Sequence, residues 1–289
     1  MSDEAALTRR MVRRAFERAA ADYDAHAVLQ REVGERMLAR LAYVKLAPHT
    51  VLDAGSGTGP ALPALRARYP ASVLCALDIA PAMLVHAQRR ASWWQRWRGR
   101  GVRPVCGDLE QLPLRGAAVG LVWSNLALQW TAAPARAFAE AQRVLEPGGL
   151  FMFSTFGPDT LRELRDAYQE GDDYAHVNRF IDMHDLGDLL VRGGFADPVM
   201  DMECITLTYA DVRALMRDLK ALGAHTVLAG RRPTLAPRAL LAQVERNYET
   251  QRRDGRLPAT FEIVYGHAWK PQPRTAPGGR RVIDIKAAS

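Results

Sequence analysis

The hydrophobic pattern through the centre of the chain alternates between two periods. Short apolar runs predict buried strands beginning near residue 51 and at residues 72–77, 102–106, 119–125 and 150–154. Between them, apolar residues recur at three- and four-residue steps over 60–69, from Pro81 onward and over 135–145, which predicts helices. This alternation is typical of an α/β protein with a doubly wound, mostly parallel sheet that binds ligands at the carboxyl ends of its strands.

The two ends of the chain follow a looser, mainly helical pattern. Residues 8–46 carry apolar side chains at helical spacing, so we expect residues 1–47 to form an N-terminal helical cap. After Gly157 the pattern predicts helices over 160–168 and 183–191, a loop over 171–180, and strands over 203–209 and 260–268. The sheet then has seven strands, and its domain comprises residues 48–210 and 259–270.

A long connection separates the last two predicted strands. Its segments 211–222 and 237–251 have helical spacing, so residues 211–258 are predicted to form a helical insertion that covers a substrate. The tail 271–289, which is rich in proline, glycine and arginine, is predicted to be disordered.

A glycine-rich turn follows the first predicted strand, with the sequence Asp53-Ala-Gly-Ser-Gly-Thr-Gly59. Glycines at alternate positions let the backbone turn tightly and approach a ligand closely. The spacing of Gly55, Gly57 and Gly59 differs from the dinucleotide pattern G-x-G-x-x-G, and no lysine follows as in a P-loop. The segment therefore predicts a nucleotide site of another kind.

Acidic residues follow three successive predicted strands. Asp53 precedes the glycines, Asp78 ends the second strand, where a carboxylate can accept from both ribose hydroxyls, and Asp108 follows the third, where it can accept from an adenine amino group. Each acid alone is equally compatible with a helix N-cap or a solvated loop. Together they disfavour a phosphate ligand, which carboxylates repel, and favour a cationic nucleoside such as S-adenosylmethionine.

Composition narrows the classes of function further. The 289 residues are 48% hydrophobic and 25% charged, contain no apolar run long enough to span a bilayer, and begin without an apolar leader. The three cysteines and seven histidines lack metal-ligand spacing, so we expect a cytoplasmic protein with neither disulfide nor metal site. The net charge of +7 suggests an acidic partner, although an arginine-rich proteome explains it equally well.

One segment combines aromatic and basic residues. Three tryptophans lie among three arginines in residues 92–101, a mixture that can bind nucleic acid. The end of a helix that packs its indoles against the domain explains the segment better, so a nucleic-acid partner is not expected.

These motifs resemble the class I S-adenosylmethionine-dependent methyltransferases, which have a Rossmann-like fold. The resemblance covers residues 48–155 and includes the glycine turn, Gly107-Asp108-Leu109 and Leu145-Glu-Pro-Gly-Gly149. It implies that the glycine turn binds the methionine moiety, Asp78 the ribose, and Asp108 with Leu109 the adenine. By the same resemblance Ile79 and Met83 line the cofactor site, and Ser124 and Asn125 lie near the methyl group.

A narrower resemblance extends over most of the chain. The elements Tyr23-Asp-x-His26-Ala, Trp123-Ser-Asn-Leu-Ala-Leu-Gln129-Trp130 and Asn178-Arg179-Phe180 are similar to those of the malonyl-[acyl-carrier protein] O-methyltransferases of biotin synthesis. That family esterifies the free carboxyl of a malonyl thioester carried by an acidic acyl carrier protein. The resemblance implies that Tyr23 and His26 close over the cofactor and that Gln129 and Trp130 face the acceptor.

The expected acceptor needs little chemical activation. A malonyl carboxylate is ionised at neutral pH, so methyl transfer requires in-line positioning and no general base. We expect a cation to bind the carboxylate, with Arg179 as the first candidate and Lys220, Arg231 and Arg232 as runners-up.

Other functions share parts of the pattern. The runs Phe156-Gly-Pro-Asp-Thr-Leu161 and Asp185-Leu-Gly-Asp-Leu-Leu190 also resemble a mitochondrial complex I assembly factor that hydroxylates a protein arginine. The remaining alternatives are an assembly protein that binds S-adenosylmethionine without catalysis, and a methyltransferase for another small acid or for RNA.

Overall fold

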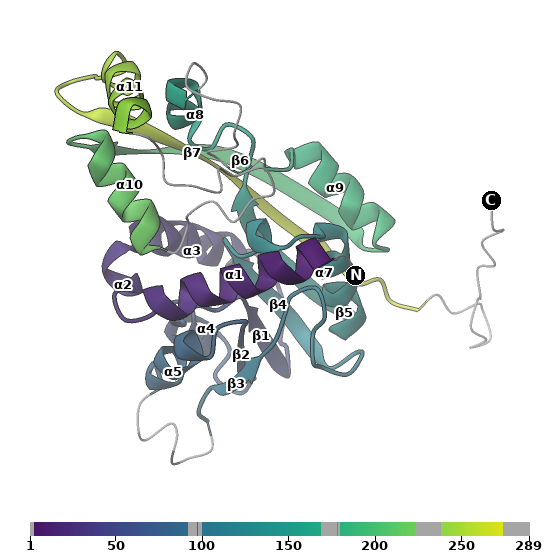
Figure 1. Cartoon of the computed structure of the whole chain (residues 1–289). Coiled ribbons are helices and arrows are strands. Elements are labelled where there is room, and N and C mark those ends of the chain that lie inside the picture. The colour runs from purple at the N-terminus through teal and green to yellow at the C-terminus, as the bar shows by residue number, and fades with distance from the viewer. Residues whose placement is uncertain are drawn as a thin grey trace, which may run out of the picture.

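The computed structural model describes residues 3–91, 97, 100–168, 178, 180–222 and 238–273. Its centre is a seven-stranded sheet with the order β3-β2-β1-β4-β5-β7-β6 (Figure 1). The strands are β1 (Thr50–Ala54), β2 (Val73–Asp78), β3 (Arg103–Cys106), β4 (Val119–Asn125), β5 (Leu145–Phe156), β6 (Ala196–Tyr209) and β7 (Leu257–Trp269). The predicted doubly wound, mostly parallel sheet is therefore confirmed.

The strand order determines where a ligand can bind. β1 pairs in parallel with β2 on one side and with β4 on the other, so the chain reverses its direction of winding between them. Ligands of open α/β sheets bind at the carboxyl ends of the strands beside such a switch point. β7 runs antiparallel between β5 and β6, and β6 is the edge strand on that side of the sheet.

Helices cover both faces of the sheet, because the strand residues are apolar on both sides. On one face, α3 (Val28–Leu41), α4 (Leu62–Arg68) and α5 (Pro81–Arg89) pack against a core that includes Val51, Leu121 and Met152. On the other face, α7 (Pro134–Val144) and α9 (Met183–Arg192) enclose Leu52, Val122 and Phe153.

The N-terminal cap consists of three helices. α1 (Asp3–Ala19), α2 (Tyr23–His26) and α3 are separated by a turn at residues 20–22 and by Ala27, whose φ of −77° and ψ of 42° are not helical. This break lets α1 cross the sheet while α3 packs on its face (Figure 1). A short 3-10 helix, η1 (Leu128–Trp130), follows β4.

Two strands, β5 and β6, begin earlier in the chain than the apolar pattern predicts. β6 begins at Ala196 rather than at residue 203, since it is an edge strand whose early residues are mostly exposed and include Asp197, Pro198 and Asp201. β5 likewise begins at Leu145, before the Pro-Gly-Gly turn sequence that we expected to precede the strand. Apolar runs detect only the buried part of such strands.

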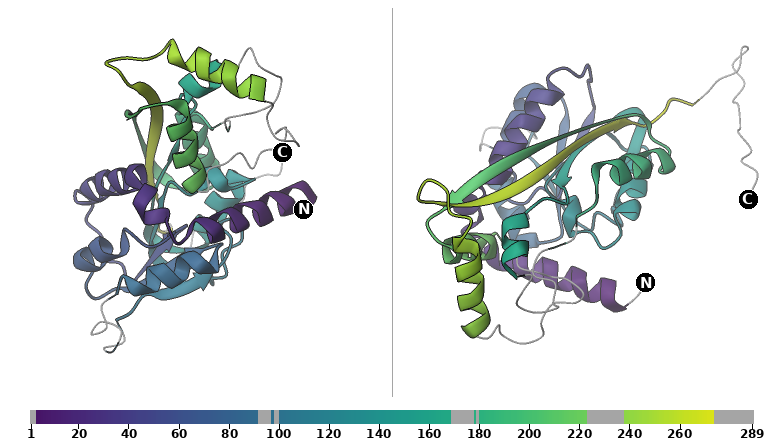
Figure 2. Two further views of the ribbon diagram at one scale, coloured as in Figure 1. Left: turned by 60° about the vertical axis from the view of Figure 1, so that its left-hand side comes forward. Right: turned by 90° about the horizontal axis from the view of Figure 1, so that it is seen from above.

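The described residues of the predicted insertion form two helices, α10 (Val212–Ala221) and α11 (Arg238–Glu249), between β6 and β7. Figure 2 shows α11 beside α8 (Arg162–Tyr168) at the far end of the long β6–β7 pair. Most of the Trp/Arg segment, the 171–180 loop and the tail beyond residue 273 lie outside the described residues. Within the described part of the chain, no helix is long and apolar enough to cross a membrane.

Candidate functional site

The glycine turn lies directly at the switch point of the sheet. The backbone N–H groups of Gly55 and Ser56 both donate to the carbonyl of Leu77, at 2.8 and 2.9 Å, which joins the turn to β2. Gly55 has a φ of +77°, and a Cβ there would lie 2.3 Å from the Cβ of Ala127. Only glycine therefore fits between the turn and the chain that follows β4.

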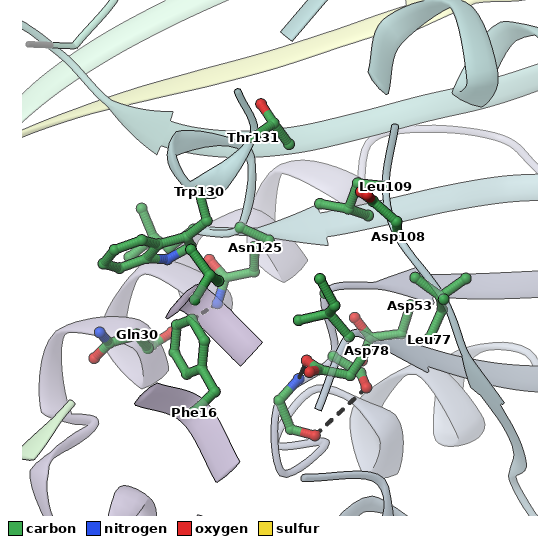
Figure 3. A pocket seen from close by; sticks show the side chains of 18 of the residues that line it. Phe16, Gln30, Asp53, Leu77, Asp78, Asp108, Leu109, Asn125, Trp130 and Thr131 are labelled. Carbon is green, nitrogen blue, oxygen red and sulfur yellow. Dashed lines mark hydrogen bonds between the residues drawn. The ribbon is translucent and has the colours of Figure 1, made fainter. Parts of the chain in front are cut away.

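A cavity of about 930 Å³ opens above this turn (Figure 3). Its walls come from the carboxyl ends of β1, β2 and β4 and from α1 and α3, so the N-terminal cap completes it. The lining includes the predicted residues Tyr23, Asp53, Gly55, Gly57, Asp78, Ile79, Asp108, Leu109, Asn125 and Trp130. The structure thus brings ten of the predicted site residues to one cavity.

Two buried carboxylates lie at the base of the cavity. Asp78 is 8% exposed, and its oxygens accept hydrogen bonds from the N–H groups of Gly57 (2.9 Å) and Ala80 (2.8 Å). Asp53 is 3% exposed, and its Oδ2 is buried without a hydrogen-bond partner. Burial raises the pKa of Asp53 to about 8, with a contribution from Asp78, and burial raises the pKa of Asp78 to about 6.

The predicted adenine-binding residues lie on the opposite wall. Figure 3 shows Asp108 and Leu109 together, apart from Asp53 and Asp78. Asp108 Oδ2 pairs with Arg9 of α1 at 2.9 Å, and Asp108 Oδ1 accepts from the N–H of Glu110. The N-terminal cap therefore contacts the predicted adenine site directly, a contact that the sequence pattern does not reveal.

A carboxylate of α2 attaches the cap to the glycine turn. Asp24 accepts a hydrogen bond from the hydroxyl of Thr58 and pairs with Arg90 at the end of α5, both at 2.5 Å. Arg90 also donates to the carbonyl of Thr58. Phe16 and Tyr23 pack beside the buried Met83, so Met83 supports the cap from beneath and is not among the cavity-lining residues.

The two polar residues that end β4 differ in their roles. Ser124 was expected beside the methyl group, but its hydroxyl donates to the carbonyl of Ala54 inside the sheet and does not line the cavity. Asn125 does line it, and its Nδ2 donates to the backbone carbonyl of Gln30 at 2.8 Å. Side chains alternate along a strand, so adjacent residues cannot both face one ligand.

A second cavity, of about 890 Å³, adjoins the first. Residues of both ends of the chain line it, including α2, η1, β6, α8 and α10. Most of the lining is apolar or aromatic, with Leu29, Leu164, Leu219, Phe156, Phe180 and Phe261 among its members. Five residues line both cavities: Phe16, Tyr23, Gln30, Leu126 and Trp130.

Three residues that line the second cavity form a hydrogen-bonded chain. His26 Nδ1 lies 2.8 Å from one oxygen of Asp218, and the hydroxyl of Tyr209 donates to the other at 2.9 Å. We expected His26 over the cofactor, but it lines the second cavity and links α2 to α10. Asp218 and Tyr209 carry no sequence signal, because their partners are distant in the chain.

The predicted acceptor residues are only partly brought together. Gln129 lines the second cavity, and its side-chain amide donates to the carbonyl of Leu126. Trp130 packs edge-on against Phe16, with 5.3 Å between the ring centroids. Lys220 is exposed on α10 and is not among the lining residues. Arg179, Arg231 and Arg232 lie outside the described residues, and no lysine or arginine occurs among the described residues that line this cavity.

The acidic and histidine residues do not assemble a metal centre in the described ranges. No group of three or more histidine, cysteine, aspartate or glutamate side chains there is placed to hold a metal ion. The three cysteines, Cys75, Cys106 and Cys204, are free thiols.

Comparisons with known proteins agree with this geometry. A family model described as a methyltransferase domain matches residues 52–153. Among solved structures, a putative methyltransferase from Bacillus halodurans has a TM-score of 0.57 at 20% identity, covering 81% of this chain and 97% of its own. That likeness shows the fold.

Curated relatives are much closer in sequence. The malonyl-[acyl-carrier protein] O-methyltransferase of Nitrosospira multiformis is 56% identical, covering 97% of this chain and 96% of its own. The protein of the same name from Gallionella capsiferriformans is 54% identical, with 97% of each chain covered. The chain therefore belongs to the malonyl-[acyl-carrier protein] O-methyltransferase family and is an S-adenosylmethionine-dependent methyltransferase.

Proposed function

We propose that this protein transfers the methyl group of S-adenosylmethionine to the free carboxylate of a malonyl thioester on acyl carrier protein. The product is the malonyl methyl ester with which pimeloyl and hence biotin synthesis begins. The observation that carries the proposal is the pair of adjoining cavities with five shared residues at the switch point. One cavity suits a cationic nucleoside, and the other is a largely apolar cavity that suits an acyl chain.

The residues of the first cavity suit S-adenosylmethionine chemically. The unpartnered buried oxygen of Asp53 can accept from the ammonium of the methionine moiety, and Gly57 leaves its side of the turn open. Asp78 can accept from the ribose hydroxyls, and Asp108 with Leu109 can contact the adenine. Bound there, the cofactor supplies an electrophilic methyl group on a sulfonium.

The second cavity suits the acceptor for two reasons. Its apolar walls remove water from the carboxylate, which strengthens its interactions with any remaining polar partner. The carboxylate is already ionised, so its oxygen forms the new O–C bond as the S–C bond breaks, and no proton moves. The electron pair of the broken bond returns to sulfur. The protein's contribution is therefore orientation and exclusion of water.

The high sequence identity to curated methyltransferases favours this function over the arginine hydroxylation of the complex I assembly factor. Relatives that are 54–56% identical over nearly the full chain carry the methyltransferase name. The basic charge of the chain also complements an acidic carrier protein.

The decisive experiment incubates the full chain with methyl-labelled S-adenosylmethionine and either malonyl- or acetyl-carrier protein. We expect label on the malonyl form alone, released as methanol by mild base, as a methyl ester requires. Cofactor binding without transfer to the malonyl form would contradict the proposal and favour an assembly protein.

A further inference from the structure

Helix α1 has two faces of opposite chemistry. Its inner face carries Val12 and Phe16, which line the first cavity. Its outer face carries Arg10, Arg14 and Arg18, which recur at every fourth residue and are exposed to solvent. At 3.6 residues per turn these three arginines occupy an arc of about 80°, on the side of the helix opposite Val12 and Phe16. They are called the arginine stripe below.

The charge of the arginine stripe is not neutralised by the described part of the chain. The neighbouring Arg9 pairs with Asp108, and Arg13 pairs with Glu17, both at 2.9 Å. None of the three arginines of the stripe forms an ion pair or a hydrogen bond with a described residue. Like charges four residues apart on a helix repel one another and destabilise it. An anionic partner would remove this repulsion.

The arginine stripe lies close to the place where the reaction must occur. α1 forms part of the outer surface of the molecule (Figure 1 and Figure 2). Phe16, on its inner face, lines both cavities. An α-helix with its side chains is about 10–12 Å across. A partner that binds to the stripe is therefore about one helix diameter from the wall that the two cavities share.

The shape of the arginine stripe favours an acidic protein over a small anion. Its ends are about 12 Å apart along the helix axis, with a guanidinium about every 6 Å. One small carboxylate cannot contact all three guanidinium groups at that spacing. A helix of a partner protein with acidic residues at every fourth position presents its carboxylates at the same interval, and guanidinium groups bind carboxylates bidentately.

We propose that the arginine stripe of α1 is the surface on which the acidic acyl carrier protein docks, with its three guanidinium groups paired to carboxylates of the carrier. This assignment rests on the function proposed above and adds the face of the protein that receives the carrier. None of the three side chains is among the described residues that line either cavity. The stripe therefore acts on capture of the carrier, as charges at the rim of an interface do, and not on methyl transfer itself.

The test compares the wild-type protein with two triple variants. The stripe variant replaces the three arginines of the stripe by alanine, which favours helix formation more than arginine does. The control variant combines Arg103→Ala, Arg115→Ala and Arg246→Ala, at three exposed arginines on other parts of the chain. Both variants lose three positive charges, so they separate a local surface from the overall charge of the protein.

The stripe variant should be impaired only with the carrier-bound substrate. We expect kcat/KM for malonyl-carrier protein to fall about tenfold, because three exposed charge pairs are lost, whereas the control variant should stay within about twofold of the wild type. With malonyl-pantetheine, which lacks the protein surface, all three proteins should agree within about twofold, as should their dissociation constants for S-adenosylhomocysteine. The difference between wild type and stripe variant should shrink at high salt, which screens exposed charges.

Binding of fluorescently labelled carrier protein, followed by anisotropy, tests docking independently of catalysis. About tenfold weaker binding by the stripe variant than by the wild type and the control variant would support the docking surface. If that result came without methyl transfer by the wild type, the proposed function alone would be overturned.

Other outcomes would overturn the docking surface. A stripe variant within about twofold of an active wild type would do so and leave the proposed function intact, as would an equal loss in the control variant. An equal loss of affinity for S-adenosylhomocysteine would mean that the arginines hold α1 on the first cavity instead. Tighter binding of the wild type to phosphatidylglycerol vesicles or to single-stranded RNA than to the carrier would assign the stripe to another partner.

Discussion

At the scale of single residues, the glycine turn shows how a short motif depends on a distant neighbour. Gly55 and Gly255 have similar positive φ angles, +77° and +73°. A Cβ on Gly55 would meet the Cβ of Ala127 at 2.3 Å, whereas one on Gly255 would meet nothing within 4 Å. A substitution at Gly255 therefore reports backbone strain alone, whereas one at Gly55 reports strain together with steric overlap.

Alanine at each position should give different losses of stability. Gly255→Ala incurs only the positive φ, roughly 1–2 kcal/mol of unfolding free energy. Gly55→Ala adds overlap with Ala127, about 1–3 kcal/mol more, and should also weaken binding of S-adenosylhomocysteine. Urea unfolding of both variants measures the difference. Equal losses would show that the turn moves away from Ala127 without cost.

The buried carboxylate of Asp53 predicts a pH-dependent stability. Its folded pKa of about 8 lies well above the usual value near 4, so the folded protein retains a proton that the unfolded chain has lost. The stability of the ligand-free protein should therefore fall as pH rises from about 4 to about 8, and Asp78 acts in the same direction up to about 6.

Melting temperatures between pH 5.5 and 8.5 test this expectation. The wild type should lose stability with rising pH, and Asp53→Asn, which cannot ionise, should show a shallower slope and exceed the wild type at pH 8.5. Parallel curves for the two proteins would exclude Asp53 as the titrating group.

At the scale of elements, the N-terminal cap is part of the site rather than an appendage. Arg9 reaches Asp108, Asp24 reaches Thr58 and Arg90, and His26 reaches Asp218, so α1 and α2 contact both the sheet domain and the insertion. The elements that cover the cofactor cavity are thus held by a few polar contacts, together with Phe16 and Tyr23.

Removal of the Asp24 contact should affect binding more than folding. The carboxylate is half exposed, so Asp24→Ala should cost about 1 kcal/mol or less of global stability. The dissociation constant for S-adenosylhomocysteine should nevertheless rise several-fold, because α2 is no longer attached to the glycine turn. Glu17→Ala removes the exposed Arg13 pair on α1 and serves as the control. Unchanged affinity in Asp24→Ala would mean that aromatic packing alone holds the cap.

At the scale of the whole molecule, charge and cavities favour a large acidic substrate. The chain has a net charge of +7, and Arg10, Arg13, Arg14 and Arg18 are exposed on α1, which borders the cofactor cavity. Long-range attraction to an acidic carrier protein is screened by salt, since the Debye length falls from about 10 Å at 0.1 M to about 3 Å at 1 M.

Activity on the carrier protein should therefore depend on ionic strength. We expect kcat/KM for malonyl-carrier protein to fall severalfold between 50 and 500 mM salt, whereas malonyl-pantetheine, which lacks the protein surface, should change little. Steady-state rates with the two substrates measure the effect. The same salt response for both would show that the carrier surface does not contribute to docking.

The parts of the fold that were predictable are those decided by local pattern. Buried parallel strands such as β4 are continuous apolar runs, so their positions are visible in the sequence, and helices such as α7 follow the expected spacing. The exposed start of β6 is not predicted, because an edge strand needs no continuous apolar run. The position of the first cavity was largely predictable, since parallel strands place their carboxyl ends together.

The amino-acid sequence by itself determined the strand and helix order, the glycine turn and the acids that follow successive strands, because each depends on neighbouring residues. The tertiary structure alone decided which side chains line the two cavities. In the folded chain His26 lines the second cavity, the Ser124 hydroxyl is hydrogen-bonded within the sheet, and Lys220 is exposed. The fold also buries Oε1 of Gln30, which lines both cavities, without a hydrogen-bond partner. These placements depend on contacts between residues tens to hundreds of positions apart, which only the assembled fold brings together.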